Sequence, residues 1–288
     1  MHRFDTPQEA RAWCADERSA GRTLGFVPTM GALHAGHRAL VERAVAECDR
    51  AVVSVFVNPL QFDDPADLER YPRDFAGDAD SLEPLGCSMV FRGTLEQFFP
   101  ESEGGEVART EPGTCAEGLE GAHRPGHFAG VATIVERLFE VVEPTTAYFG
   151  AKDYQQSLVV GELARRRGRP RIEVCATVRE ADGLALSSRN LLLSPEARTR
   201  ALVLFRALEQ ARSAWQGGER FAAPLAAAME EHLDADELEL EYAAVRDPEA
   251  WTAEAPDGPL EQARALVAAR IGGVRLIDNC ALHGDAHG

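Results

Sequence analysis

Two histidines, His34 and His37, follow an apolar run at residues 24–27 and precede an amphipathic run at residues 38–48. With two glycines between the runs, this order predicts a strand, a tight turn and a helix. A helix N-terminus presents backbone N–H groups that bind anions. Histidines at i and i+3 of such a helix share one face and can donate hydrogen bonds to a phosphate. The turn is therefore either a phosphate-binding site or a solvated loop.

A single lysine, Lys152, stands in a chain whose 30 basic side chains are otherwise all arginine. Arginine and lysine are not interchangeable where a compact ammonium is required. Lys152 follows Gly150 at the end of a predicted strand and precedes a predicted helix at residues 154–167, which is a second phosphate-binding geometry. The helix also places Gln156 one turn further in, where it can face the same pocket.

Polar side chains also follow two other predicted strands. Asn58 and Gln61 come after a β-branched run at residues 50–57, and a Ser-Ser-Arg sequence lies at residues 187–189. Ligands bind α/β folds at the carboxyl ends of the parallel strands, so these groups are candidates for substrate and polyphosphate binding. A single loop amide more often stabilises its own turn, and Ser-Ser-Arg alone is a weak signal.

Two loops have an unusual charge. Residues 121–128 carry Arg124 and His127 in a strongly acidic protein, and they form either a contact to an anionic substrate or a surface turn. Residues 63–74 are acidic and contain two prolines, and we expect a loop that acts as a mobile flap over the site.

The order of elements predicts an α/β fold with a parallel sheet. Short apolar runs alternate with helical patterns up to about residue 178, and a smaller α+β domain follows. In that second part we expect helices between residues 194 and 232 and strands at residues 238–245 and 270–279. The predicted division is residues 1–179 for nucleotide and substrate binding, residues 180–283 for a small lid domain, and residues 284–288 for a disordered tail.

The composition narrows the class of protein. A net charge of −17 argues against nucleic-acid binding, and no apolar stretch is long enough for a membrane span. The first residues carry no apolar signal region, so we expect a cytoplasmic protein. The six cysteines form no C-x-x-C pair and are expected to be reduced and mostly buried.

The combination of motifs is more specific than any one of them. His-x-Gly-His after a first strand resembles the signature of the HIGH-type nucleotidyltransferases. The whole set closely resembles the pantothenate synthetase family, in order over almost the whole chain. The segments that carry the resemblance are residues 28–37, 56–62, 71–73, 124–128, 149–156, 187–190 and 275–279.

This resemblance implies a Rossmann-like N-terminal domain, a small C-terminal lid domain and a homodimer. It also implies an ATP-dependent ligase that condenses pantoate with β-alanine to give pantothenate, AMP and diphosphate through a pantoyl-adenylate. The partners are then the small molecules pantoate, β-alanine and ATP, with Mg²⁺ on the phosphates. The metal ligands stay unassigned, and Asp153 and Asp78 are weak candidates.

The resemblance also implies roles for single residues. His37 is the catalytic histidine, and His34 and Lys152 join it as donors to the reacting phosphates. Gln61 and Gln156 hold pantoate, with Gln61 also near β-alanine and Asn58 beside it. The residues that bind ATP are Met30, Gly31, Ala32, Leu33, His34, Ala35, Gly36, His37, Gly150, Ala151, Lys152, Asp153, Val178, Leu186, Ser187, Ser188 and Arg189.

Two positions depart from the family pattern: Leu186 stands where methionine is usual, and Ala151 where glutamate is usual. Leucine and methionine have similar volumes, so we expect little effect.

Three other functions remain to be separated from the ligase: a nucleotidyltransferase with a phosphate acceptor, a tRNA synthetase, and a non-catalytic nucleotide-binding protein. AMP release that depends on an amine substrate distinguishes the ligase from the nucleotidyltransferase.

Overall fold

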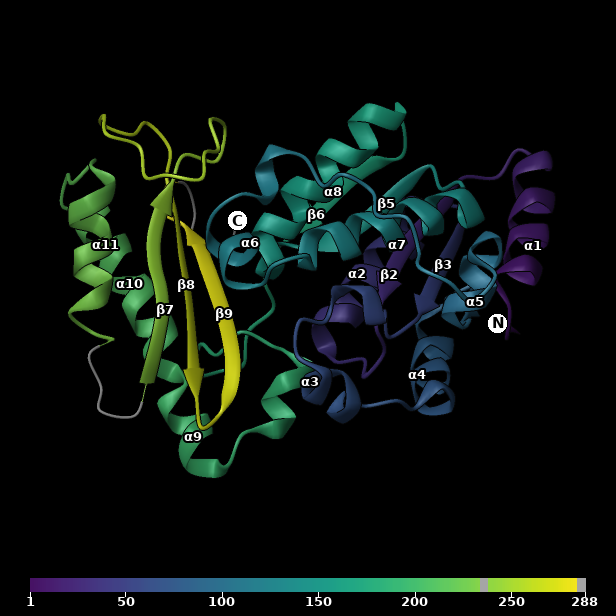
Figure 1. Cartoon of the computed structure of the whole chain (residues 1–288), viewed down its shortest axis with the longest axis horizontal. Helices are drawn as coiled ribbons and strands as arrows, with labels where there is room; N and C mark the ends of the chain where they lie inside the picture. Colours follow the sequence, from purple (N-terminus) through teal and green to yellow (C-terminus); the bar gives the residue numbers. More distant parts are fainter. Residues whose placement is uncertain (234–237, 284–288) are drawn as a thin grey trace. The chain divides into compact units, whose positions relative to one another are not determined.

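The computed structural model describes residues 1–233 and 238–283, and the chain forms two compact units (Figure 1). The first unit comprises Met1–Ala116, Arg124–Gly150 and Gln155–Cys175. The second comprises Glu117–His123, Ala151–Tyr154 and Ala176–Gly288. The predicted tail at residues 284–288 lies outside the described residues.

The first unit is built on a parallel sheet, which in the described residues has six strands in the order β1-β4-β3-β2-β5-β6. This confirms the predicted α/β fold with a Rossmann-like sheet. The order places β2 between β3 and β5, so the carboxyl ends of these three strands are neighbours. The strands are β1 (His2–Phe4), β2 (Leu24–Thr29), β3 (Arg50–Val55), β4 (Met89–Phe91), β5 (Thr146–Gly150) and β6 (Arg171–Cys175).

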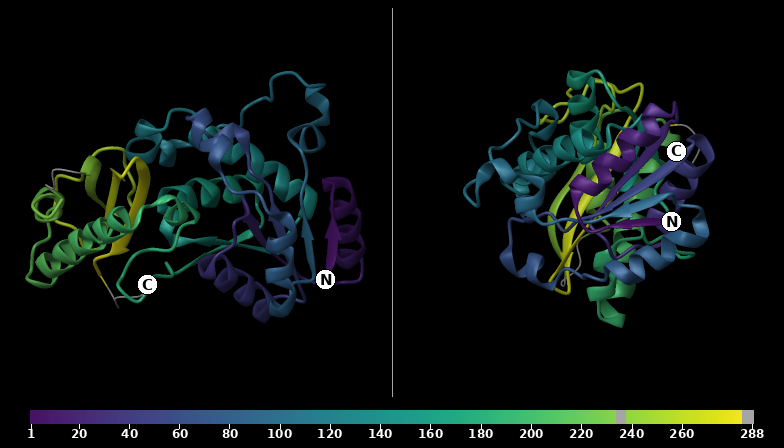
Figure 2. Two further views of the ribbon diagram at one scale, coloured as in Figure 1. Left: turned by 90° about the horizontal axis from the view of Figure 1, so that it is seen from below. Right: turned by 90° about the vertical axis from the view of Figure 1, so that its right-hand side faces the viewer.

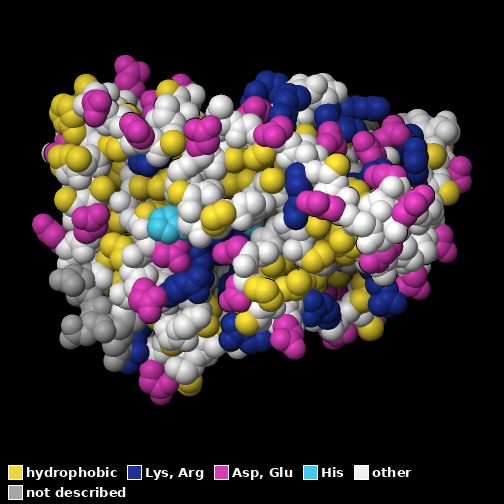
Figure 3. Space-filling view, viewed as in Figure 1, with side chains coloured by type: hydrophobic (Ala, Val, Ile, Leu, Met, Phe, Trp, Pro, Cys, Tyr) yellow, Lys and Arg dark blue, Asp and Glu magenta, His cyan; other side chains and the backbone are white. Residues whose placement is uncertain are grey.

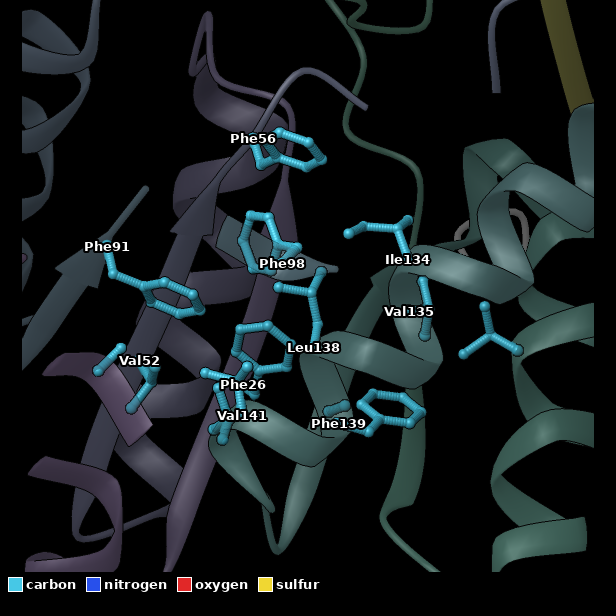
Figure 4. Packing of buried hydrophobic residues seen from close by; sticks show 14 of the residues in the cluster. Phe26, Val52, Phe56, Phe91, Phe98, Ile134, Val135, Leu138, Phe139 and Val141 are labelled. Carbon is cyan, nitrogen blue, oxygen red and sulfur yellow. The ribbon is translucent and has the colours of Figure 1, made fainter. Parts of the chain in front are cut away.

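Both faces of this sheet are covered because its side chains alternate between two apolar clusters. Phe26 and Val52 belong to a cluster with helices α1, α7 and α8, whereas Val27 and Val53 belong to one with α2 and α4. Figure 2 shows α1 alongside the strands, and Figure 4 shows the phenylalanines of the first cluster facing α7. The helices of this unit are α1 (Pro7–Ser19), α2 (Ala35–Glu47), α3 (Pro65–Arg70), α4 (Phe75–Leu82), α5 (Leu95–Phe98), α7 (His127–Val142) and α8 (Tyr154–Arg167), whereas α6 (Leu119–His123) belongs to the second unit.

The second unit contains an antiparallel sheet of β7 (Leu238–Arg246), β8 (Arg264–Ile271) and β9 (Val274–Ala281). Helices α9 (Pro195–Arg200), α10 (Leu202–Gln216) and α11 (Ala222–Glu230) share one apolar cluster with it. The predicted smaller α+β part is therefore confirmed.

The prediction of a single strand at residues 270–279 is wrong. Two strands meet there in a hairpin whose turn residues, Gly272 and Gly273, have φ of 57° and 76°. Positive φ at both central positions is the geometry of a two-residue hairpin turn, and it favours glycine. The two adjacent glycines indicate this turn in the sequence, although the apolar residues on both sides suggest one continuous strand.

Three other boundaries differ from the predictions. The acidic loop contains helix α3, which Asp64 caps by accepting from the backbone N–H of Ala66, with Pro65 at the first position. The apolar pattern predicts a strand over residues 171–178, but strand β6 ends at Cys175. Helix α7 begins at His127, so the predicted basic loop is largely helical.

Acidic and basic side chains are interspersed on the face of the molecule drawn in Figure 3. No helix within residues 1–233 and 238–283 is both long and apolar enough to cross a membrane.

Candidate functional site

The turn between β2 and α2 is closed by its two histidines. His34 is the N-cap of α2, and its Nδ1 accepts from the backbone N–H of Gly36 at 3.1 Å. His37 lies three residues later, and its Nδ1 accepts from the backbone N–H of His34 at 3.3 Å. This is a reciprocal capping box built from imidazoles. His34 caps the helix and does not lie within it, but the two rings lie side by side at the helix N-terminus, as the i, i+3 spacing predicts.

The capping bonds determine which ring nitrogen carries the proton. A neutral imidazole has one acceptor and one donor nitrogen, so Nδ1 acceptance in His34 and His37 leaves the proton on Nε2 of both rings. The ring centroids are 4.1 Å apart. The turn therefore presents two neighbouring rings with Nε2–H donors.

The loop before the cap is held by a buried carboxylate that the sequence did not single out for this role. Asp78, in α4, accepts from the backbone N–H of Ala32 at 3.0 Å and of Leu33 at 2.8 Å. Gly31 has φ of 85°, and a Cβ there would lie 2.7 Å from an Asp78 oxygen. Burial raises the pKa of Asp78, although these two backbone bonds lower it.

These contacts change the expected source of anion-binding donors. The backbone N–H groups of Ala32, Leu33, His34 and Gly36 all donate to side chains of the chain itself. These four backbone donors are thus engaged within the chain, and their part in phosphate binding stays a prediction. The imidazole donors of His34 and His37 remain the suited groups on this turn.

Gln61 lies on the 3₁₀ turn η1 (Pro59–Gln61), which follows β3. Its Nε2 donates to Sδ of Met30 at 3.0 Å, so η1 and the turn after β2 meet at one edge of the sheet. Its Oε1 accepts from Nδ2 of Asn58 at 3.0 Å. Asn58 is buried, caps η1 and also donates to the carbonyl of Gly130 at 3.1 Å. Its amide thus holds Gln61 in place.

The neighbouring glutamines after β5 differ in their surroundings. Gln155 is buried and donates to the carbonyl of Cys115 at 3.0 Å, which is a structural contact. Gln156, the predicted pantoate-binding residue, is partly exposed. Gly150 ends β5, next to β2 in the sheet, so the first unit brings it to the same edge as Met30.

Lys152 belongs to the second unit, in the 3₁₀ turn η5 (Ala151–Asp153). Its side chain is 17% exposed, and Nζ lies 3.8 Å from Oδ1 of Asp153. The turn is held from β9, because Nδ2 of Asn279 donates to the carbonyls of Ala151 at 3.0 Å and Lys152 at 2.8 Å.

A tight hairpin connects the other predicted ATP-binding residues. The backbone N–H of Leu186 donates to the carbonyl of Val178 at 3.0 Å, and Arg179 pairs with Ala185. Arg179 also forms two hydrogen bonds, of 2.6 and 2.9 Å, with the carboxylate of Asp278 in β9. Val178 and Leu186, predicted to bind one nucleotide, therefore lie side by side.

The Ser-Ser-Arg sequence follows directly. Ser187 caps the 3₁₀ turn η6 (Ser188–Leu192), and its hydroxyl accepts from the backbone N–H of Arg189 at 3.3 Å. Ser188 is buried and Arg189 is partly exposed. The turn is thus a side-chain-capped 3₁₀ N-terminus that includes Arg189.

A separate cavity of about 570 Å³ lies in the second unit. Arg179, Arg212 and Glu209 line it, together with Ala151 at one side. Arg179 is paired with Asp278, and Arg212 lies 2.7 Å from Glu209, so much of the charge of its walls is compensated within the unit. Lys152 and Ser187 are not among its lining residues.

Sequence reasoning did not assign three supporting residues: Asp78, Asp278 and Asn279. The last two stand in β9, whose other residues apart from Arg275 are apolar, and are 4% and 3% exposed. Adjacent polar residues in a buried strand are unusual and were an available signal. Asp78 offered none, because an acidic residue in a first helical turn is common.

Comparison with known proteins agrees with these features. The family model described as pantoate-beta-alanine ligase matches residues 2–281. The pantothenate synthetase of Rubrobacter xylanophilus is 50% identical over 96% of this chain and 97% of its own length. That of Pseudomonas fluorescens is 46% identical over 97% of both chains.

Solved structures with a similar fold are also pantothenate synthetases. Pantothenate synthetase from Thermus thermophilus superposes with a TM-score of 0.90 at 46% identity, covering 99% of this chain and 100% of that one. Pantoate-beta-alanine ligase from Francisella tularensis, complexed with beta-gamma ATP and beta-alanine, has a TM-score of 0.79 at 31% identity over 99% of both chains. With matches of this extent in sequence and in fold, the chain belongs to the pantoate–β-alanine ligase family.

Proposed function

We propose that this chain makes pantothenate in two half-reactions, with the imidazoles of the β2–α2 turn as donors to the reacting phosphate. Membership of the family makes it an ATP-dependent ligase that condenses pantoate with β-alanine. The observation that carries the mechanism is the reciprocal cap, which fixes Nε2–H of His34 and His37 as donors.

The first half-reaction activates pantoate. A carboxylate does not react with an amine because its leaving group is too poor. A pantoate carboxylate oxygen therefore attacks the α-phosphorus of ATP, the bond to the bridging oxygen breaks, and pyrophosphate leaves with the electron pair. Negative charge builds on the phosphate oxygens, and preorganised donors stabilise it.

Several side chains have the chemistry for this stabilisation. His37 and His34 donate from Nε2, Lys152 supplies a compact ammonium, and Arg189 supplies a planar guanidinium. We assign ATP binding to four segments of the chain, on the resemblance of their motifs to those of the family. They are residues 30–37, 150–153, 178 and 186–189.

Pantoate binding is assigned to Gln61 and Gln156. An amide has both a donor and an acceptor, which suits a substrate that carries hydroxyl and carboxylate groups. The weak contact of Gln61 Nε2 with the Met30 thioether is one that a better acceptor would replace. Asn58 supports this amide through its bond to Gln61 Oε1.

Mg²⁺ is proposed as the ion that accompanies ATP. The described residues contain no group of three or more His, Cys, Asp or Glu that could hold a metal. Mg²⁺ in nucleotide enzymes is usually bound by substrate phosphates with one or two carboxylates. Asp153, 48% exposed beside Lys152, fits that role better than Asp78, whose oxygens accept two backbone N–H groups.

The second half-reaction needs no nucleophile from the protein. The neutral amine of β-alanine attacks the acyl carbon of the adenylate, an amide bond forms, and AMP leaves with the former carboxylate oxygen. The amine loses one proton in this step.

Excluding water protects the anhydride from hydrolysis. We propose that the second unit acts as a lid and residues 63–74 as a flap. The division at residues 179 and 180 and the cytoplasmic location remain predictions from the sequence pattern, and the homodimer remains one from the family resemblance.

Product analysis tests this function. Purified protein with pantoate, β-alanine and ATP should give pantothenate and AMP in equal amounts. Formation of ADP in place of AMP would indicate an acyl-phosphate route and contradict the proposal. AMP release without any amine would indicate a simple adenylyltransferase.

A further inference from the structure

Arg124 and His127 are buried, whereas the sequence left open whether they contact an anionic substrate or belong to a surface turn. Arg124 is 9% exposed and His127 is 6% exposed. A buried guanidinium is costly unless it is paired and hydrogen-bonded. The contacts that compensate this cost show what the two side chains hold.

Both side chains hold the main chain at Gln61. The carbonyl oxygen of Gln61 accepts from Nδ1 of His127 at 2.7 Å and from Nη2 of Arg124 at 3.2 Å. Nη1 of Arg124 lies 3.1 Å from Nε2 of His127, so the guanidinium also holds the ring. Because a guanidinium is a donor only, Nε2 of His127 must accept, and the proton of the neutral ring is on Nδ1.

Asp63 holds the guanidinium from the other side. Its Oδ1 accepts from Nε of Arg124 at 3.1 Å, which leaves one edge of the guanidinium for His127 and Gln61. Burial alone would raise the pKa of Asp63, but the charge and hydrogen bond of Arg124 hold it below its ordinary value. Asp63 is therefore the anion that compensates Arg124 at ordinary pH.

The first turns of α7 complete this support. A Cβ on Gly130 would lie 2.0 Å from the carbonyl oxygen of Leu60, so the backbone of α7 touches η1 directly. The carbonyl of Gly130 accepts from Asn58, whose amide also reaches Oε1 of Gln61. His127 of α7 thus fixes the main chain of Gln61. Asn58, itself bonded to the Gly130 carbonyl of α7, fixes the side chain of Gln61.

We propose that Arg124 and His127 are positioning residues that fix the main chain at Gln61 and so orient its amide for the hydroxy-acid substrate. This inference rests on the proposed pantoate-binding role of Gln61. Both residues act through Gln61 and not on the reacting atoms, so their loss should weaken pantoate binding selectively. Misplacement of a substrate-binding group by about 1 Å is enough to reduce a rate strongly.

Histidine variants with and without a donor test this role. His127→Asn keeps an N–H near the position of Nδ1, whereas His127→Leu has no donor and leaves the Gln61 carbonyl one bond short. We expect His127→Leu to raise the KM for pantoate about tenfold, the loss of one hydrogen bond at a buried site, with the KM for ATP unchanged. His127→Asn should stay within about threefold of the parent protein.

A matched control is His2→Asn, because His2 is exposed on β1 and its ring contacts Phe4 and Trp13 instead. It should leave the KM for pantoate unchanged. If His127→Leu does not fold, Asp63→Ala takes its place, since it removes the support of Arg124 without altering the ring. We expect Asp63→Ala to raise the KM for pantoate by about threefold or more.

Equal effects of His127→Asn and His127→Leu, or equal changes in the KM values for pantoate and ATP, would overturn the positioning role. So would a ¹⁵N NMR spectrum showing His127 protonated on Nε2 alone. The KM for pantoate of Gln61→Ala tests the proposed role of Gln61 separately from the positioning role of Arg124 and His127. A normal KM for pantoate in Gln61→Ala removes the assigned role of Gln61, and the inference fails with it. A raised KM there with a normal value in His127→Leu overturns the inference alone.

Discussion

Each histidine of the β2–α2 turn uses one ring nitrogen to cap the helix, which determines what the other nitrogen can do. Nδ1 of His34 and of His37 accepts from the backbone, so Nε2–H is the donor in both rings. The cap thus orients both imidazoles for their proposed role as hydrogen-bond donors to a phosphate.

His37→Asn separates the cap from the catalytic donor. Asparagine can accept the His34 N–H through Oδ1, close to the position of Nδ1, but it has no group where Nε2–H lies. We expect adenylation to fall by about 10²-fold with an unchanged melting temperature. His37→Ala should lose the same rate and also about 1 kcal/mol of stability, from the lost cap. A near-normal adenylation rate in His37→Asn would remove His37 from the chemistry.

Lys152→Arg tests whether the single lysine of the chain is required. Arginine keeps the charge but replaces a compact ammonium with a larger planar group, in a side chain that is 17% exposed. We expect kcat to fall by about tenfold or more. Arg165→Lys, an exposed position near the end of α8, is the matched control and should have normal kcat. Normal kcat in Lys152→Arg would mean that the lysine is incidental.

At the scale of elements, β9 organises the turn that carries Lys152. Asn279 donates to two carbonyls of η5, and Asp278 holds Arg179 at the start of the hairpin that bears Val178 and Leu186. One strand of the small sheet therefore fixes both segments of the second unit that are assigned to ATP. This explains two polar side chains in a buried strand.

Asn279→Asp tests this support. The substitution replaces the Nδ2 donor with an oxygen, so the carbonyls of Ala151 and Lys152 lose their donor and face a negative charge. We expect a higher KM for ATP and a loss of about 1–3 kcal/mol in the free energy of unfolding. Steady-state kinetics and urea denaturation measure the two effects. Gln262→Glu, a change in another amide that contacts Glu249, should affect neither, and an unchanged Asn279→Asp would refute the role of β9.

The sequence predicted secondary-structure elements better than it predicted the side-chain contacts between them. Hydrophobic period and capping residues located the α/β unit and helix α8, because those signals are local. The hairpin at Gly272 and Gly273 was missed because apolar residues continue on both sides of the turn. Motif order located the histidines, Lys152 and Gln61, but not Asp78 or the bonds of Arg124, because these depend on residues far apart in the chain.

At the scale of the whole molecule, the thiols are protected by burial. Cys14, Cys87, Cys175 and Cys280 are buried, and the described residues contain no disulfide. Burial raises the pKa of Cys14 and of Cys87 to about 12 and that of Cys280 to about 11. The thiolate is the reactive form, so these groups are unreactive at neutral pH. This fits a mechanism that uses no side-chain nucleophile.

Alkylation with iodoacetamide at neutral pH checks this protection. The native protein should be modified slowly and only at the partly exposed Cys48 and Cys115, whereas all six cysteines should react in denaturant. Mass spectrometry of peptides identifies the sites. Rapid modification of Cys14 or Cys87 in the native protein would show that the packing around these thiols opens readily.

In the proposed mechanism, pantoate is activated as an adenylate before β-alanine reacts. Exchange of labelled pyrophosphate into ATP reports on this first half-reaction alone. With the native protein, exchange should require pantoate and proceed without β-alanine, and addition of β-alanine should then release AMP and pantothenate. Exchange that needs β-alanine, or that occurs without pantoate, would contradict the adenylate route.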